Sequence, residues 1–189
     1  MTHATDVVLA HHTSSAAQSL LDELCDVYAD AYGVDPDGEK VSAFRDRATA
    51  QLDRPSFDLV TARADGRMVG FALGYALPAN TFWWDGLTPE PAAGFATEDG
   101  TRTVVLSEIE VRQAWQGMKL GRQLHDGLLA NRTEQRATLA TGPGAEHARA
   151  IYSRWGWQSV GTVPGKPGAY FSEYHLFVLP LPIDAAVWL

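Results

Sequence analysis

EIEVRQAWQGMKLGRQLHDGLL, residues 108–129, joins the end of a strand to the start of a helix. The preceding residues, TRTVVLS, are rich in β-branched side chains, which favour a strand. This strand ends in two acids, Glu108 and Glu110, which share one face because side chains alternate along a strand. After the turn QGMKLG, leucines recur at helical spacing at positions 120, 124 and 128. The stretch therefore predicts a strand, a glycine-marked turn and an amphipathic helix.

The turn QGMKLG is a candidate anion-binding site. The first amides of a helix have no partner within the helix, and the helix dipole places partial positive charge there. Phosphate groups bind at such helix starts, and Lys119 and Arg122 add positive charge to this one. An ordinary strand-to-helix turn is the alternative. The chain has no Gly-Lys-Ser/Thr of a P-loop, and GPGAEH (residues 142–147) lacks the third glycine of a dinucleotide fingerprint.

The other predicted elements surround this stretch in a regular order. Asp65-Gly66 is a strong hairpin signal between two strands, and Gly156 is placed to end a helix. Ser15 and Gln18 have the spacing of a capping box at the start of a first helix. Between the predicted strands, residues 78–100 form a long loop with exposed-looking aromatics. The predicted strands are 6–9, 57–64, 67–77, 101–111, 137–141, 157–163 and 169–179, and the predicted helices are 15–31, 40–52, one after residue 119, and 145–155.

Composition limits the class of protein. The chain has 189 residues with 46% hydrophobic and 20% charged content, which fits one packed domain. No apolar run approaches the roughly 18 residues of a membrane span, and MTHATDVVLAHH does not resemble a signal peptide. Cys25 is the single cysteine, so no internal disulfide framework exists. We therefore expect a cytoplasmic protein that binds no membrane.

Charge is distributed unevenly along the chain. The formal net charge is -8, which argues against general nucleic-acid binding. Residues 112–136 nevertheless hold five Lys or Arg against two acids, whereas residues 22–39 hold seven acids and no base. The first region favours anions and the second favours cations. Two solvated helix faces are the alternative for the acidic region.

Two segments of the chain resemble one protein family. VRQAWQGMKLGRQL resembles the acetyl-CoA-binding motif of the GNAT superfamily of N-acetyltransferases, Arg/Gln-x-x-Gly-x-Gly/Ala after a strand that ends in valine. Val111, Gln116 and Gly121 match that motif, and Lys119 stands where a glycine is usual. AEHARAIYSRWGWQSVG, residues 145–161, is similar to the family pattern Asn-x-x-Ala-x-x-Leu-Tyr-x-x-x-Gly-Phe, although Ala145 replaces the asparagine. The matching or nearly matching residues are Ala148, Ile151, Tyr152, Gly156 and Trp157.

The resemblance implies a fold and a co-substrate. The fold would be a mixed, three-layer α/β domain over residues 1–189, with a mostly antiparallel central sheet of about seven strands flanked by helices. The co-substrate would be acetyl-CoA, with no metal ion. The implied cofactor-binding residues are Ile109, Val111, Gln116, Gly117, Met118, Lys119, Leu120, Gly121 and Arg122.

The implied reaction transfers an acetyl group to a primary amine. An alkylamine with a pKa of about 10.4 is almost wholly protonated at neutral pH and must lose a proton before it attacks. Glu108 or Glu110, directly or through water, is the expected general base. Tyr152 matches the tyrosine that protonates the leaving CoA thiolate in this family. The alternatives are solvated acids at the strand end and a tyrosine packed in the core.

The acceptor site is expected among aromatic residues of the early helices and the long loop. Tyr28, Tyr32, Trp83 and Trp84 fall in those regions, and aromatic faces beside acids suit a small cationic amine. Packing of the two tryptophans on the core or on a second subunit is the alternative. The sequence does not decide whether the protein forms a homodimer.

The sequence is compatible with three functions. The first is N-acetylation of a small-molecule amine. The second is acetylation of a protein N-terminus or lysine, which needs an open groove. The third is a non-catalytic, regulatory acyl-CoA-binding module. The histidines show no metal-ligand spacing.

Overall fold

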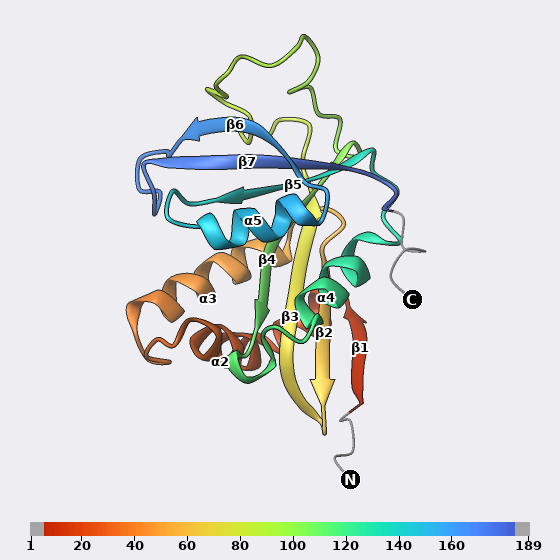
Figure 1. Cartoon of the computed structure of the whole chain (residues 1–189), viewed down its shortest axis with the longest axis vertical. Helices are drawn as coiled ribbons and strands as arrows, with labels where there is room; N and C mark the ends of the chain where they lie inside the picture. The colour runs from red at the N-terminus through yellow and green to blue at the C-terminus, as the bar shows by residue number, and fades with distance from the viewer. Residues whose placement is uncertain (1–5, 184–189) are drawn as a thin grey trace. The chain divides into compact units, whose positions relative to one another are not determined.

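The computed structural model describes residues 6–183 of the chain (Figure 1). The start of the segment in which we expect no signal peptide therefore lies outside the described residues. The elements are β1 (Val7–His12), α1 (Ser14–Gln18), α2 (Leu21–Tyr32), α3 (Glu39–Leu52), β2 (Asp58–Ala64), β3 (Arg67–Ala76), β4 (Thr103–Val111), the 3-10 helix η1 (Gln113–Trp115), α4 (Leu120–Leu129), β5 (Arg136–Thr141), α5 (Glu146–Arg154), β6 (Gln158–Pro164) and β7 (Glu173–Pro180).

One seven-stranded sheet connects these strands in the order β1-β2-β3-β4-β5-β7-β6. The pairs β1–β2, β2–β3, β5–β7 and β6–β7 are antiparallel. β4 and β5 pair in parallel, from Thr103 opposite Arg136 to Val105 opposite Thr138. The expected mixed α/β fold, with a mostly antiparallel sheet of seven strands and flanking helices, is confirmed.

The described chain divides into two compact units. The first comprises residues 6–75 and 106–131, and the second comprises residues 76–105 and 132–182. β4 contributes its start to the second unit and its end to the first. The expectation of a single domain over residues 1–189 stays a prediction.

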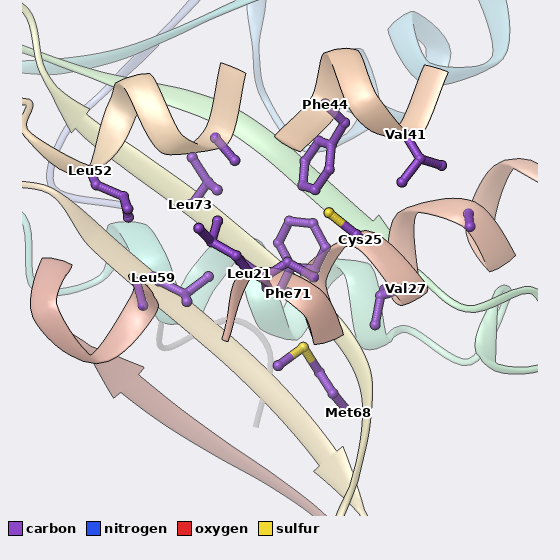
Figure 2. Close-up of a cluster of buried hydrophobic side chains, with 14 residues drawn as sticks. Leu21, Cys25, Val27, Val41, Phe44, Leu52, Leu59, Met68, Phe71 and Leu73 are labelled. Atoms are coloured by element: carbon purple, nitrogen blue, oxygen red, sulfur yellow. The ribbon is translucent and has the colours of Figure 1, made fainter. Parts of the chain in front are cut away.

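The core of the first unit fills the space between α1–α3 and one face of β2 and β3. Leu59 and Leu73 are directly opposite each other on the two strands, and Phe71 follows on the same face. Figure 2 shows these side chains pointing toward Phe44 of α3 and Leu21 of α2. All five are less than about a tenth exposed, so apolar burial fixes α2 and α3 against this face of the sheet.

The other face of the same strands is covered by α4. Leu120, Leu124 and Leu128 of this helix are buried, and α4 lies in front of β2 and β3 in Figure 1. The approach is close at Gly70 of β3, where an added Cβ would lie 2.9 Å from the Glu110 carbonyl oxygen and 2.9 Å from a Leu124 methyl carbon. The glycine therefore allows β3, β4 and α4 to pack tightly.

Two local expectations need correction. The apolar periodicity predicted one first helix, but the structure has two, α1 and α2, separated at Ser19 and Leu20. The N-cap of α1 is Thr13, which makes no side-chain capping bond, so the capping box proposed for Ser15 and Gln18 is wrong. The hairpin is confirmed, since Asp65 and Gly66 have φ of 49° and 79° and lie between β2 and β3.

The second unit holds the long loop in place with a buried ion pair. Glu98 accepts bonds from the Trp84 indole N–H at 2.9 Å and from the Thr103 hydroxyl at 2.8 Å. Arg136 donates to the same carboxylate at 2.8 Å, and its guanidinium lies over the rings of Trp84 and Phe95. A paired and hydrogen-bonded charge tolerates burial, so this network anchors the loop to β5.

We predict that Gly70→Ala lowers the free energy of unfolding by about 1–3 kcal/mol, because the new methyl group overpacks the contact between β3, β4 and α4. Denaturant unfolding measures the change. The matched control is Gly127→Ala in α4, where the nearest atom would lie 3.4 Å away. This control should keep or raise stability, since alanine favours a helix over glycine. Equal stability of the two variants would contradict the packing described here.

Candidate functional site

Glu108 and Glu110 lie on one face of β4, as the alternation of the strand predicted. Their side chains face α2 and α3, and both are largely buried: Glu110 is 8% exposed and the Glu108 side chain 11%. The alternative of two solvated acids at the strand end therefore does not hold. Ile109 and Val111 alternate with them, and Val111 approaches Gly70 on the α4 side of the sheet.

Each buried carboxylate has a different partner. The Tyr32 hydroxyl donates to Glu110 Oε1 at 3.0 Å. The Nε of Arg47, from α3, donates to Glu108 Oε1 at 2.8 Å. Glu108 thus has a cationic partner, whereas Glu110 has a neutral hydroxyl.

An aromatic series beside the carboxylates connects them to the core. Tyr28 stacks on Phe44, with ring centroids 4.4 Å apart and an interplanar angle of 13°. Tyr32 follows one helical turn later, 4.7 Å from Tyr28. Phe44 is fully buried, whereas Tyr32 is 57% exposed. The structure therefore brings together the predicted residues Tyr28, Tyr32, Glu108 and Glu110 in a site that leads from the core to the surface.

The two carboxylates are shifted toward their protonated forms. Burial raises the pKa of Glu110, and the neighbouring charge of Glu108 raises it further, to about 8. Burial also raises the pKa of Glu108, although Arg47 opposes this shift. Glu110 has no cationic partner of its own, and its pKa lies near the working range of a general base at neutral pH.

The turn before α4 has the geometry of an anion site. Gly117 and Lys119 both have a left-handed backbone, with φ of 77° and 63°, and α4 begins at Leu120 without a side-chain cap. Residues 116–119 are exposed. The amides at this helix start are therefore available to a ligand, and the residues present fit a pyrophosphate group. A pocket of about 360 Å³ lies beside the turn, lined by Asp6, Val7, Trp115, Met118, Leu120 and Gln123.

Most of the positive charges in residues 112–136 are paired with acids of the same protein. The four arginines of this stretch each pair with an acid: Arg112 with Asp30, Arg122 with Asp126, Arg132 with Glu134, and Arg136 with Glu98. Within the described part of the chain, no acid pairs with Lys119. This lysine is therefore the cation of the stretch that is positioned to bind an added anion.

The acidic region is also partly neutralised. Asp22 pairs with Arg45 at 2.7 Å, Glu23 pairs with Arg63 at 2.7 Å, and the backbone N–H of Gln113 donates to Asp30 at 2.9 Å. The attraction for a cationic ligand expected from this region is reduced accordingly.

Two further polar contacts position the turn. The Gln116 side chain donates to the Val111 carbonyl at 3.0 Å and to the Ala31 carbonyl at 3.4 Å. Arg112 donates to the Met68 carbonyl at 2.8 Å. These bonds connect the end of β4 to α2 and β3. Gln116, predicted as a cofactor-binding residue, thus braces the turn through its side chain.

The remaining predicted site residues belong to the second unit. The Trp83 indole N–H donates to the Thr138 hydroxyl at 3.1 Å, and Trp84 is buried against Glu98 and Arg136. Tyr152 on α5 is half-buried, with its ring 5.9 Å from that of Trp155 and 6.0 Å from that of Trp157. The substrate-binding role of the two tryptophans and the catalytic role of Tyr152 stay predictions.

Sequence reasoning missed Arg47. It lies three residues after Phe44, so both occupy the same face of α3, and the Arg47 guanidinium carbon is 5.7 Å from the Phe44 ring centroid. A cation next to a core phenylalanine on an amphipathic helix is the signal that points to it. Its acidic partner could not be read from the sequence, because Glu108 is 61 residues away.

Metal sites and membrane-spanning helices are both absent from residues 6–183. No group of three or more His, Cys, Asp or Glu side chains there could hold a metal ion. None of the helices in that range combines the length and the apolar character needed to cross a membrane.

Comparison with known proteins gives one family and one fold. A model of the acetyltransferase (GNAT) family matches residues 18–157. No curated protein sequence matches the chain. Solved structures with the same fold include an aminoglycoside 6'-acetyltransferase type Ii, which is 16% identical with a TM-score of 0.63 and covers 94% of this chain and 99% of its own.

Two other similar structures bear on the ligands. The ribosomal-protein-S18-alanine N-acetyltransferase from Escherichia coli is 16% identical, with a TM-score of 0.60, and the match covers 95% of this chain and 97% of that one. A GNAT family acetyltransferase from Elizabethkingia anophelis with acetyl-CoA bound is 15% identical, with a TM-score of 0.55, over 93% of this chain and 98% of that one. At these identities the likeness shows the fold.

The raised pKa of Glu110 predicts a pH-dependent stability. Unfolded Glu110 ionises near pH 4.5, whereas the folded residue ionises near pH 8. Between these values the folded protein holds a proton that the unfolded chain has lost, so the free energy of unfolding falls as the pH rises. Glu110→Gln removes this contribution to the pH dependence of the free energy of unfolding, because glutamine does not ionise. Its stability relative to the unmodified protein should therefore increase from pH 4.5 to pH 8 and then level off.

Denaturant unfolding at a series of pH values measures this difference. A constant difference for Glu110→Gln would show that Glu110 ionises normally in the folded protein.

Proposed function

The chain belongs to the GNAT acetyltransferase family, and on that premise we propose that it transfers an acetyl group from acetyl-CoA to the primary amine of a small cationic molecule. The family membership makes it a transferase of acyl groups. The observation that carries the proposal is the pair of buried carboxylates, Glu108 and Glu110, beside exposed Tyr32. A buried carboxylate with a pKa of about 8 suits proton removal from an ammonium group at neutral pH.

The donor would be held at the start of α4. The exposed turn at residues 116–119, the left-handed backbone at Gly117 and the uncapped helix start support binding of the acetyl-CoA pyrophosphate by backbone amides. Lys119 adds a positive charge at the same position. When bound, acetyl-CoA supplies the thioester that the amine attacks. Ile109 and Val111 would line the pantetheine along β4, as the family resemblance implies.

The acceptor amine would enter between α2 and the end of β4. Glu110 takes one proton from the ammonium group, directly or through a water molecule, and the neutral amine then attacks the thioester carbonyl. Tyr28 and Tyr32 present aromatic faces to the cation before it loses that proton. Glu108 keeps the local charge that holds the Glu110 pKa high. We also assign Trp83 and Trp84 to the acceptor site, as the sequence predicts.

The leaving thiolate also requires a proton. Tyr152 is assigned this step because it occupies the tyrosine position of the family pattern, and it stands on α5 against Trp155 and Trp157. Collapse of the tetrahedral adduct would break the carbon–sulfur bond, the tyrosine hydroxyl would give its proton to the CoA sulfur, and the amide nitrogen would lose its remaining surplus proton to water. Acid and base then exchange their protons with solvent before the next turnover.

Calorimetric titration with acetyl-CoA, with free CoA and an adenine nucleotide as controls, tests the donor site first. Micromolar binding that prefers the thioester, followed by CoA release on addition of amines, supports the proposal. Binding without amine-dependent CoA release would identify a non-catalytic acyl-CoA-binding module. CoA release with peptides alone would identify a protein acetyltransferase. Absence of acetyl-CoA binding would contradict the proposal.

Three conservative substitutions should separate catalysis from binding. We predict that Glu110→Gln and Tyr152→Phe each lower kcat by about 10²–10⁴, the usual contribution of a general acid or base, and that Glu108→Gln also lowers kcat, because it removes the charge that raises the Glu110 pKa. Their affinity for acetyl-CoA should stay within about threefold. The control is Tyr170→Phe, because Tyr170 lies in the second unit and is 71% exposed. Full activity in all three variants would show that the mechanism is wrong.

A further inference from the structure

Arg47 is a cation within the candidate acceptor site. It approaches from α3 and is fixed on two sides, by the bond from its Nε to Glu108 at 2.8 Å and by the ring of Phe44 at 5.7 Å. Its side chain nevertheless remains 44% exposed. Arg47 is therefore held rigidly and is also accessible to a ligand.

Some hydrogen-bond donors of the Arg47 guanidinium group have no partner within the described part of the protein. A guanidinium carries five N–H donors in a planar fork. Glu108 takes one, the Ala43 carbonyl takes a second at 3.4 Å, and the Tyr28 hydroxyl is a third partner. The N–H groups of the guanidinium that have no partner among the described residues can donate to an oxygen anion.

The charges around Arg47 exclude one kind of acceptor and favour another. The titratable groups that interact with Arg47 are Tyr28, Glu108 and Glu110, and the Tyr32 hydroxyl donates to the last of these. An acceptor with a second cationic group would find Glu108 already paired and would meet the positive charge of Arg47. An acceptor with an anion near its amine would place the amine toward Glu110 and the anion at Arg47.

We propose that Arg47 determines the specificity of the acceptor site and binds a carboxylate that the acceptor carries beside its primary amine, as an amino acid does. This inference rests on the proposed acetyl transfer to a primary amine, and it makes the acceptor a molecule whose cationic ammonium group is accompanied by a carboxylate. Arg47 binds the acceptor and takes no part in proton transfer. A role limited to bracing Glu108 is the competing account, and it predicts no preference between acceptors.

Matched acceptors with and without the carboxylate test the inference. CoA release is measured with phenylalanine against 2-phenylethylamine, tryptophan against tryptamine, and lysine against cadaverine. The unmodified protein should show a kcat/KM at least about tenfold higher for the carboxylate-bearing member of an accepted pair, the usual worth of hydrogen bonds to a charged group. Arg47→Gln should bring that ratio close to one.

Two further variants separate binding from bracing. Arg47→Lys keeps the charge without the fork, so it should retain part of the ratio, and it serves if Arg47→Gln fails to fold. Arg45→Gln is the matched control, because Arg45 lies on the same helix and pairs with exposed Asp22. This control should leave the ratio unchanged.

The outcomes distinguish the two proposals. Acetylation of amines without a carboxylate preference, or a preference that survives in Arg47→Gln, overturns the role of Arg47 and leaves the proposed function intact. An equal loss of activity for both members of a pair shows bracing of Glu108 and also overturns it. If no amine of any pair releases CoA, the proposed function fails, and the inference fails with it.

Discussion

Two carboxylates buried on one face of β4 are the constraint that shapes the first unit of this protein. Removing a charge from water is unfavourable unless a partner compensates it. Glu108 has Arg47 as its partner, and Glu110 has the Tyr32 hydroxyl. Both partners come from helices that the hydrophobic core fixes against β2 and β3 (Figure 2). The same packing that stabilises the unit thus positions both carboxylates, and the incomplete compensation of Glu110 raises its pKa.

The end of β4 and the turn after it show how local charge differs from net charge. A chain with a net charge of -8 would repel a phosphate group on average. The turn offers backbone amides instead, and Lys119 is a cation there that no described acid neutralises. The arginines nearby hold the structure together: Arg112 binds Asp30 and a carbonyl of β3, and Arg122 binds Asp126. The anion binding that we propose for this region would therefore depend on helix geometry more than on the number of basic residues.

The sequence predicted the features that depend on local pattern. The hairpin at Asp65-Gly66, the strand that ends in two glutamates and the helix start after QGMKLG all follow from spacing, and the structure has each of them. Periodicity did not reveal the break between α1 and α2, because apolar residues recur on both sides of Ser19. The partners of the carboxylates could not be predicted at all. Tyr32 and Glu110 are 78 residues apart, and only the folded core brings them together.

The raised pKa of Glu110 can be observed directly, by carbon-13 NMR of protein labelled at its glutamate side-chain carboxyl carbons. A titration from pH 4 to pH 10 follows each carboxyl resonance, and a spectrum of Glu110→Gln assigns the signal. We expect one glutamate to titrate near pH 8 and its resonance to be absent from the variant. If every glutamate carboxyl titrates below about pH 6, within the usual range for this side chain, then Glu110 does not have a raised pKa and is not the general base that we propose.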